Sequence, residues 1–240
     1  MTKNKPFTIV ANWKMNGNNA SSKDLTLAVS NFVESQKITS KIIVAPPSLY
    51  LKEVYNHKSN LVALAAQNCH DQVTGAYTGE ISALMLKGIG CDYVILGHSE
   101  RRSLFNEDDQ FISRKAYQAI EFGLTPIICV GETMQQKEDE KAFEVISSQL
   151  SGSIPENANK TNCLIAYEPV WAIGSGLIPE ESHISEMHKH IKNHSDMPVL
   201  YGGSVKSSNC VAIKSISNVD GLLVGGASLK KDEFCKIIAE

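Results

Sequence analysis

Short runs of hydrophobic residues alternate along this chain with longer segments in which hydrophobic residues recur at helical spacing. The short runs lack regular polar alternation, which is typical of parallel strands that are covered on both faces. They predict strands at Phe7–Ala11, Ile42–Ala45, Leu61–Ala65, Tyr93–Leu96, Thr125–Val130, Cys163–Tyr167, Val199–Tyr201 and Gly221–Val224. The helical patterns between them include Ser21–Gln36, Asp108–Phe122, Met134–Leu150, Ser182–His194 and Asp232–Ile238.

Eight strand-then-helix units in 240 residues predict an α/β protein, either a closed (β/α)8 barrel or a large doubly wound sheet. Closed barrels reach about 250 residues as one domain, so the length is compatible with a single domain. No linker or low-complexity tract divides the sequence. We therefore expect one domain over residues 1–240, with the polar stretch Gly152–Asn162 forming a loop between a helix and a strand.

Polar residues and glycines follow the C-terminal end of nearly every predicted strand. In a barrel those ends meet at one mouth, where active sites are built. The residues are Asn12, Lys14 and Asn16 after the first strand, Gln67 and Asn68 after the third, Gly97-His98-Ser99-Glu100 after the fourth, Glu168 after the sixth, Gly202-Gly203-Ser204 after the seventh, and Gly225-Gly226 after the eighth.

The composition narrows the class of protein. The chain is 42% hydrophobic and 20% charged, with a net charge of −3, which argues against a general nucleic-acid binder. The N-terminal residues lead straight into the first strand, and no segment predicts a signal peptide or a membrane span. The cysteines form no C-x-x-C pair, so we expect buried free thiols in a reducing cytoplasm rather than disulfides or a zinc site. They are Cys69, Cys91, Cys129, Cys163, Cys210 and Cys235.

After the sixth predicted strand, a single carboxylate, Glu168, stands directly before Pro169. Pro169 cannot extend a central ladder and biases the residue before it, so the strand ends there. The mainly apolar residues 170–173 and the glycines Gly174 and Gly176 have the composition of a short flap with a flexible end. The alternative is an idle, solvated glutamate. Apolar residues that cover a carboxylate remove its water and make it a stronger base, so Glu168 is the candidate base.

The two glycine clusters each follow a strand and precede a helical pattern. Without a Cβ, backbone N–H groups approach an anion closely, and a helix start adds a favourable dipole. The seventh and eighth strands of a barrel commonly form a phosphate site in this way. Lys14 is a mobile cation near the same mouth that offsets phosphate or oxyanion charge. Taken singly, these features are compatible with tight turns and a surface lysine; together they predict a phosphate site.

His98 precedes Ser99-Glu100, a pair that is able to open a helical turn. An imidazole at a helix N-terminus stays neutral and donates a hydrogen bond, whereas the alternative for a lone histidine is a packed ring. We expect the histidines on the helical pattern after the flap to face solvent, and they show no metal-ligand spacing. These are His183, His188, His190 and His194.

One carboxylate base, one neutral imidazole, one lysine and a phosphate site suit proton transfer beside a carbonyl group. The glutamate takes a proton from carbon, while the histidine and the lysine stabilise the enediolate oxygens. This chemistry needs no cofactor and no metal.

The same residues lie in segments that resemble the triosephosphate isomerase family, in the family's order and over nearly the whole chain. The segments are Asn12 to Gly17, Gln67-Asn68, Gly75 to Ser82, Gly97 to Arg102, Tyr167 to Gly176, Tyr201 to Val205 and Gly225 to Leu229. The resemblance implies a closed (β/α)8 barrel in the cytoplasm. It would interconvert dihydroxyacetone phosphate and D-glyceraldehyde 3-phosphate in glycolysis and gluconeogenesis, without a cofactor.

The resemblance also implies a role for each matching residue. Glu168 would shuttle the proton between C1 and C2, and His98 would polarise and protonate the oxygens. Asn12 and Lys14 would hold the substrate and its developing charge, with Glu100 supporting the lysine and the histidine. The positions that match the family's phosphate site are Gly174, Ser204, Gly225 and Gly226.

The family is usually a homodimer, and the loop from Gln67 to Ser82 matches the segment that inserts into the partner. Thr78 would reach the partner's active site; the alternative is a plain surface excursion. Residues 169–179 would form a lid that excludes water. The lid departs from many members at Ser175 and Leu177, where they carry Thr and Lys, and Pro179 should stiffen its second hinge.

Two other classes of protein remain open. One is a non-catalytic barrel that binds sugar phosphates, and the other is a different barrel enzyme that shares only the phosphate site. A binding module needs no base, so Glu168, His98 and Lys14 argue against the first. The segments around Asn12 and from 97 to 102 disfavour the second.

Overall fold

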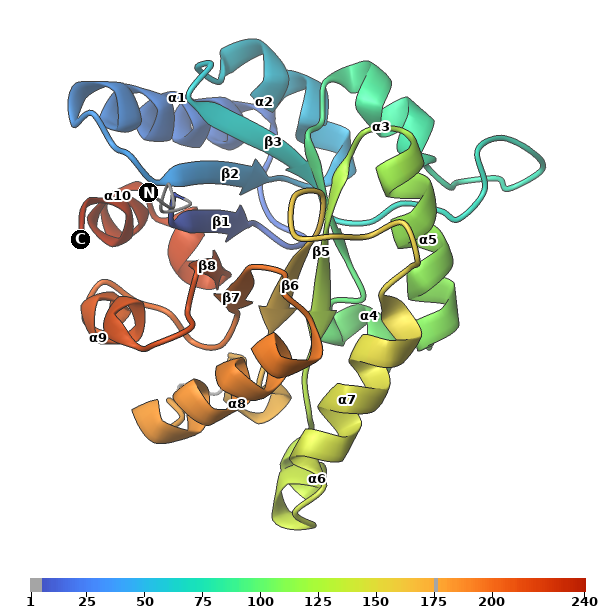
Figure 1. Ribbon diagram of the computed structural model, residues 1–240. Helices are drawn as coiled ribbons and strands as arrows, with labels where there is room; N and C mark the ends of the chain where they lie inside the picture. Colours follow the sequence, from blue (N-terminus) through green and yellow to red (C-terminus); the bar gives the residue numbers. More distant parts are fainter. Residues whose placement is uncertain (1–5, 175–176) are drawn as a thin grey trace.

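The computed structural model describes residues 6–174 and 177–240. Eight parallel strands pair in chain order, and the last pairs with the first, so the sheet closes into a barrel (Figure 1). The closure confirms the predicted barrel and excludes the doubly wound sheet. The strands are β1 (Thr8–Asn12), β2 (Lys41–Ala45), β3 (Val62–Ala66), β4 (Tyr93–Leu96), β5 (Thr125–Val130), β6 (Leu164–Tyr167), β7 (Val199–Tyr201) and β8 (Gly221–Val224).

Hydrophobic side chains cover both faces of the strands, which explains why the sequence shows continuous runs. In β1, Val10 points into the barrel, whereas Ile9 and Ala11 pack outward against the helices. The interior layer is formed by Val10, Ile43, Ala45, Ala65, Tyr93, Ile95, Ile127, Cys129, Ala166, Leu200 and Leu223. Because burial is two-sided, each strand lies within one residue of its predicted bounds.

Helices surround the strands on the outside (Figure 1). The helical segment predicted at Met134–Leu150 is wrong in one respect: it is two helices, α6 and α7. Glu140 lies between them in a left-handed conformation (φ 58°), which no helix interior allows. The α-helices are α1 (Asn19–Ser35), α2 (Leu51–His57), α3 (Ala83–Ile89), α4 (Ser99–Leu104), α5 (Asp109–Glu121), α6 (Met134–Glu138), α7 (Ala142–Ser153), α8 (Glu181–His194), α9 (Cys210–Ser215) and α10 (Lys231–Ala239).

Three single turns of 3₁₀-helix complete the described elements. These are η1 (Ser48–Tyr50), η2 (Val170–Ala172) and η3 (Gly226–Leu229). Two of them follow strands at the mouth: η2 comes after β6 and contains the first residues of the flap, and η3 comes after β8 and begins at the second glycine of its cluster.

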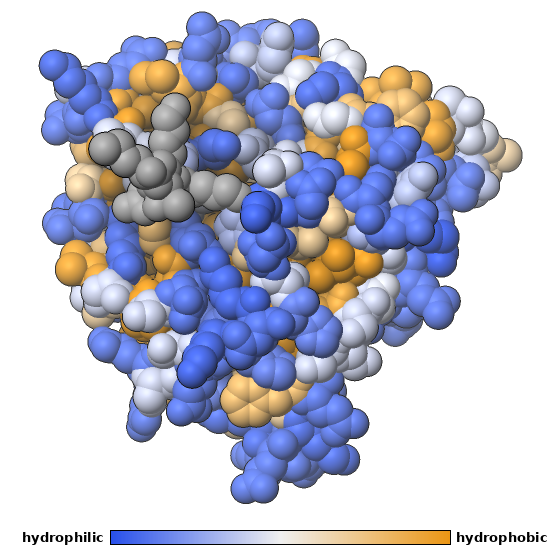
Figure 2. Space-filling model, in the orientation of Figure 1, coloured by the Kyte–Doolittle hydropathy of each residue, from blue (hydrophilic) through white to orange (hydrophobic). Residues whose placement is uncertain are grey.

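The loop between β3 and α3 projects far from the barrel (Figure 1). Its tip is exposed, and hydrophobic side chains gather over α3 beside it (Figure 2). Tyr77 of the loop and Leu84 and Met85 of α3 are among the exposed hydrophobic residues. The loop is the segment that the sequence resemblance predicts to insert into a partner subunit.

The thiols behave as the composition predicted. All six cysteines are free, and all except the half-buried Cys235 are buried. Burial raises the pKa of Cys69, Cys91 and Cys163 to about 12, so these thiols stay protonated at neutral pH. Among the residues that the structure describes, no helix has the length and apolar character needed to cross a membrane.

Candidate active site

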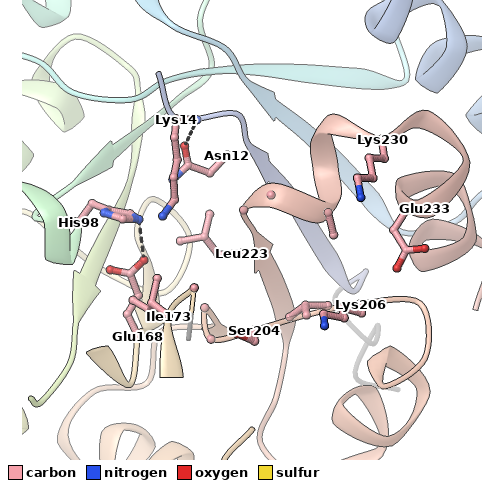
Figure 3. A pocket seen from close by; sticks show the side chains of 17 residues that line it. Asn12, Lys14, His98, Glu168, Ile173, Ser204, Lys206, Leu223, Lys230 and Glu233 are labelled. Atoms are coloured by element: carbon pink, nitrogen blue, oxygen red, sulfur yellow. Dashed lines mark hydrogen bonds and ion pairs between the residues drawn. The ribbon is translucent and has the colours of Figure 1, made fainter. Parts of the chain in front are cut away.

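A cavity of about 810 Å³ opens at the carboxyl ends of the strands (Figure 3). Side chains that lie far apart in the sequence line it together, as the barrel arrangement requires. Asn12, Lys14, His98 and Glu168 lie at one end, and Ser204 leads away from them toward Lys206, Lys230 and Glu233 (Figure 3). Gly174, Gly225 and Gly226 also contribute to the wall.

Glu168 directly follows β6 with its carboxylate turned into the barrel mouth, where the residue is only 2% exposed. Its Oε2 accepts a hydrogen bond from the Ser99 N–H at 2.9 Å, and its Oε1 lies 3.0 Å from His98 Nε2. Gly202 leaves room for this side chain, because a Cβ there would lie 2.9 Å from Glu168 Cγ. The carboxylate is therefore desolvated, oriented by two donors and open to the cavity on one side.

His98 is the N-cap residue of α4, and this position sets its tautomer. Its Nδ1 accepts a hydrogen bond from the Glu100 N–H at 3.2 Å. A neutral ring with an acceptor at Nδ1 carries its hydrogen on Nε2, so Nε2 donates to Glu168. The Glu100 carboxylate lies 3.7 Å from Nδ1, beyond hydrogen-bond distance. The geometry thus presents a neutral imidazole donor to the cavity, as the sequence predicted.

Lys14 follows β1 in a left-handed backbone conformation (φ 51°), which is costly for a residue with a side chain. Its N–H donates to Asn12 Oδ1 at 3.1 Å, and its carbonyl accepts from Gln67 Nε2 at 2.9 Å. Gln67 Nε2 also donates to the Ala45 carbonyl at 2.8 Å. The Lys14 ammonium pairs with Glu100. Gln67 therefore holds the strained turn, a function that its position after β3 alone does not reveal.

The other end of the cavity is built from backbone groups. Gly226 begins η3, and the first amides of such a turn lack partners within it. The Ser204 hydroxyl donates to the Ala172 carbonyl at 2.6 Å, so its hydrogen is engaged by the flap and the backbone amides remain as donors at this end. Lys206 and Lys230 add positive charge beyond the glycines, and the sequence interpretation did not include them.

A second buried carboxylate, Glu132, lies behind the site and was also not predicted. It follows β5 and is 0% exposed. Its Oε1 accepts hydrogen bonds from the Tyr167 hydroxyl at 3.0 Å and from Trp171 Nε1 at 2.8 Å. Tyr167 immediately precedes Glu168 in the sequence, and Trp171 follows Glu168 three residues later. Lys137 Nζ lies over the Trp171 ring, 3.6 Å from its centroid. The sequence could have pointed to Glu132, because it follows a strand and a glycine. Its hydrogen-bond partners, however, are not predictable from the local sequence.

The expectation that the α8 histidines face solvent is wrong for His188, which is 0% exposed. Its Nδ1 bonds the Asn218 carbonyl at 3.1 Å, and its ring packs edge-on against Tyr167. Burial lowers the pKa of His188 to about 4, so the ring is neutral at physiological pH. His183 and His190 are half-buried, and His194 is exposed as predicted. The helical pattern located the helix but did not resolve which of its polar residues face inward.

The charged residues Arg101, Glu107 and Lys115 form a separate hydrogen-bonded network. The Glu107 Oε1 atom accepts from Arg101 Nε and from Lys115 Nζ, each at 2.6 Å. Lys115 Nζ also lies 3.1 Å from Asn68 Oδ1. Burial lowers the pKa of Lys115, and the hydrogen bond from its ammonium to Glu107 opposes this shift. This network ties α4 and α5 to the residues that follow β3.

Two other predicted positions stand apart from the main cavity. Glu100 lines an adjoining cavity of about 670 Å³, which also contains Asn12, Lys14 and His98. Thr78 lies exposed on the projecting loop, away from the cavity of its own chain. Ser175 lies outside the described residues. Over residues 6–174 and 177–240, no group of three His, Cys, Asp or Glu side chains is arranged to hold a metal ion.

The described geometry allows proton transfer at carbon. A desolvated carboxylate and a neutral imidazole donor face the same space, with an ammonium beside them and a backbone anion site at the opposite end. A small substrate with a carbonyl group at one end and an anionic group at the other fits this polarity.

Comparison with known proteins points to one family. A sequence profile described as triosephosphate isomerase matches residues 7–240. Triosephosphate isomerase of Wolbachia pipientis wMel is 46% identical over 235 residues, which cover 98% of this chain and 93% of the relative. Triosephosphate isomerase of Mesorhizobium japonicum is 43% identical over 95% of this chain and 93% of its own length. The crystal structure of triosephosphate isomerase from Bartonella henselae aligns with a TM-score of 0.89 at 36% identity, covering 97% of this chain and 98% of that one.

Proposed function

We propose, from the premise that this chain belongs to the triosephosphate isomerase family, that it interconverts dihydroxyacetone phosphate and D-glyceraldehyde 3-phosphate. The observation that carries the proposal is one cavity lined by Glu168, His98 and Lys14 at one end and by the Ser204 and Gly225-Gly226 backbone at the other. We propose further that residues 1–240 form one catalytic domain that acts in the cytoplasm, in glycolysis and gluconeogenesis.

In this mechanism the substrate lies with its phosphate at the glycine end, near Gly174, Ser204, Gly225 and Gly226. The Glu168 carboxylate removes a proton from C1 of the ketose, and the electron pair of the C–H bond forms the C1–C2 double bond of an enediolate. His98 Nε2–H donates to the carbonyl oxygen as negative charge develops there. His98 passes its Nε2 proton to the C2 oxygen and takes the hydroxyl proton of the C1 oxygen in return. As the proton returns from Glu168 to C2, the C1–C2 electron pair forms the new C2–H bond and the C1 oxygen closes to a carbonyl, which gives the aldose.

Lys14 and Asn12 support this step without exchanging a proton with carbon. The Lys14 ammonium stabilises the negative charge of the enediolate and of the phosphate. Asn12 holds the strained Lys14 turn through its Oδ1 atom. Glu100 pairs with Lys14 and limits where the ammonium lies. All the groups that this mechanism needs are side chains and backbone amides of the protein, and no cofactor takes part.

Exchange of substrate hydrogen with solvent tests the proposed reaction. The purified chain is incubated with dihydroxyacetone phosphate in D₂O, and deuterium at C1 is followed by NMR beside a coupled assay for the aldose. We expect both deuterium incorporation and turnover. A folded protein that binds the substrate but gives neither would be the non-catalytic sugar-phosphate-binding barrel instead.

We also propose that the active unit is a homodimer. Met15 is 95% exposed, and Leu104 and Phe105 are also exposed beside it around the second cavity. An exposed apolar rim of this kind is typical of a protein interface. Thr78 at the tip of the projecting loop would enter this cavity of the partner subunit and approach Lys14 and His98.

Thr78→Arg tests the dimer, because a large cation at the loop tip would not fit beside Lys14. We expect monomers with weak activity, measured by sedimentation and by the coupled assay. Gln72→Arg, at the exposed base of the same loop, is the control and should remain dimeric. A fully active Thr78→Arg dimer would contradict the proposed interface.

A further inference from the structure

His183 connects the start of α8 to the end of β6, across the flap that separates them in the sequence. Its Nε2 lies 3.1 Å from the Tyr167 hydroxyl and 3.7 Å from Glu132 Oε1. Its ring meets Trp171 edge-on, with 5.8 Å between the ring centroids. The imidazole is half-buried, with 23% of its side chain exposed. These contacts place His183 against the two residues that flank Glu168 on either side.

The hydrogen bonds in this group have a defined direction. The Tyr167 hydroxyl has one hydrogen, and the Glu132 carboxylate can only accept it, at 3.0 Å. Burial raises the pKa of Tyr167 far above its usual range, so the hydroxyl keeps that hydrogen. The His183 Nε2 atom must then donate to the tyrosine oxygen. The chain of donors runs from His183 through Tyr167 to Glu132, where the Trp171 N–H arrives from the flap.

We propose that His183 is a positioning residue for the isomerisation: its hydrogen bond aims the Tyr167 hydroxyl at Glu132 and thereby fixes the backbone on both sides of the base. The inference deepens the proposed function and rests on it. Tyr167 directly precedes Glu168, and Trp171 begins the flap three residues later. Both are held by the same Glu132 oxygen, so a change in Tyr167 is transmitted to Trp171 through a shared acceptor.

The position of His183 gives it a second effect. It lies on α8, just after the flap, whereas Trp171 lies where the flap begins. Contact with Tyr167 and Trp171 therefore ties the two ends of the flap to one buried carboxylate. Lys137, which covers the Trp171 ring from α6, closes the remaining side of the indole. Without the His183 donor, the hydrogen bond to Glu132 alone holds the Tyr167 hydroxyl, and the geometry of the base loosens.

The test compares His183→Leu, which lacks the donor, with His183→Gln, whose amide N–H is able to replace it. His194→Leu, on the exposed part of the same helix, is the control. We expect kcat for D-glyceraldehyde 3-phosphate to fall about five- to tenfold in His183→Leu, with KM changed less than about twofold, because His183, Tyr167 and Trp171 are not among the residues that line the cavity. His183→Gln and the control should stay within about twofold of the wild type in kcat.

A double-mutant cycle with Tyr167→Phe separates a positioning role from a general loss of stability. If His183 acts through the tyrosine hydroxyl, adding His183→Leu to Tyr167→Phe should cost less than about twofold more in kcat. Additive losses would overturn the proposal. So would a folded His183→Leu with wild-type kcat, or a His183→Gln variant as impaired as the Leu variant. If His183→Leu does not fold, His183→Met, which also lacks the donor, takes its place in the cycle.

A spectroscopic measurement reports on the same contact without catalysis. The chain has two tryptophans, Trp13 and Trp171, so 5-fluorotryptophan labelling gives two ¹⁹F resonances that Trp171→Phe assigns. Both variants lose the imidazole ring that faces Trp171, so the Trp171 resonance should shift further in His183→Leu, which also loses the donor, than in His183→Gln. An unmoved resonance would overturn the proposal. Wild-type turnover in the same assay keeps this outcome distinct from failure of the proposed function.

Discussion

Two glutamates stand at the ends of neighbouring strands, and the structure gives them opposite surroundings. Glu132 follows β5 and Glu168 follows β6, and both are buried. Glu132 accepts hydrogen bonds from the Tyr167 and Trp171 side chains. It is not among the residues that line the cavity. Glu168 receives one backbone N–H and one imidazole and faces the cavity. Burial alone therefore does not distinguish Glu168, the proposed base, from Glu132, whereas an open side toward a substrate-sized cavity does.

The variants Glu168→Gln and Glu132→Gln are the strongest test of whether the two glutamates differ in role. Removal of the base should lower kcat about 10²- to 10⁴-fold in Glu168→Gln, the range typical of general-base catalysis. Glu132→Gln keeps a carbonyl acceptor for Tyr167 and Trp171, so kcat should fall less than about threefold. Steady-state assays and circular dichroism check both. Similar losses in the two variants would mean that the carboxylates do not have separate roles.

Glu132→Leu sharpens the comparison on the side of stability. The change removes the acceptor that the Tyr167 hydroxyl and the Trp171 N–H share, and each lost hydrogen bond to a charged group costs about 1.5–3 kcal/mol. Relief of the buried charge offsets part of this cost, so the free energy of unfolding should fall by about 3 kcal/mol. Urea unfolding measures it. A variant as stable as the wild type would show that Glu132 is not an anchor.

His188, which packs edge-on against Tyr167, allows its burial to be tested through the pH dependence of stability. The pKa of His188 is about 4 in the folded protein, below the ordinary value of 6.5, so the unfolded chain takes up its proton first as the pH falls. The free energy of unfolding should be unaffected above pH 6.5 and should decline by about 3 kcal/mol as the pH reaches 4. His188→Leu should remove this component, whereas His194→Leu should retain it. Equal pH slopes in all three proteins would exclude the buried neutral histidine.

The smallest expected effect concerns the space that Glu168 occupies. A Cβ at Gly202 would lie 2.9 Å from Glu168 Cγ and would push the carboxylate aside. We expect Gly202→Ala to lower kcat about tenfold, since small displacements of a catalytic group are costly. Gly88→Ala is the control, because a Cβ at that helical position meets nothing within 4 Å. A Gly202→Ala enzyme with normal kcat would show that the base tolerates displacement.

Much of the barrel could be predicted from the sequence, because the hydrophobic pattern of neighbouring residues indicates where each strand lies. A strand buried on both faces must be hydrophobic at every position, so the runs located all eight strands within one residue. Strand order in a (β/α)8 barrel then brings the polar residues after each strand to one mouth. That argument predicted the grouping of Asn12, Lys14, His98, Glu168 and the Gly225-Gly226 pair around a single cavity.

The misses concern contacts between distant segments. The division of Met134–Leu150 depends on one left-handed residue, Glu140, whose sequence gives no strong breaker. Gln67 was noticed as a polar residue after the third strand and as part of a family segment, but neither observation revealed that it holds the Lys14 turn 53 positions away. His188 carries the same helical pattern as exposed histidines. Its burial follows from the barrel surface on which α8 rests.

The sequence by itself determined the fold class and which residues stand at the mouth, because hydrophobic burial and strand order act on patterns that neighbouring residues carry. Tertiary structure alone decided how those residues are oriented. The orientation of the Glu168 carboxylate, the strained Lys14 turn and the different surroundings of two similar glutamates all depend on hydrogen-bond partners from other strands and helices. Such partners are determined by distances and directions in three dimensions, and the spacing of residues along the chain does not give these distances and directions.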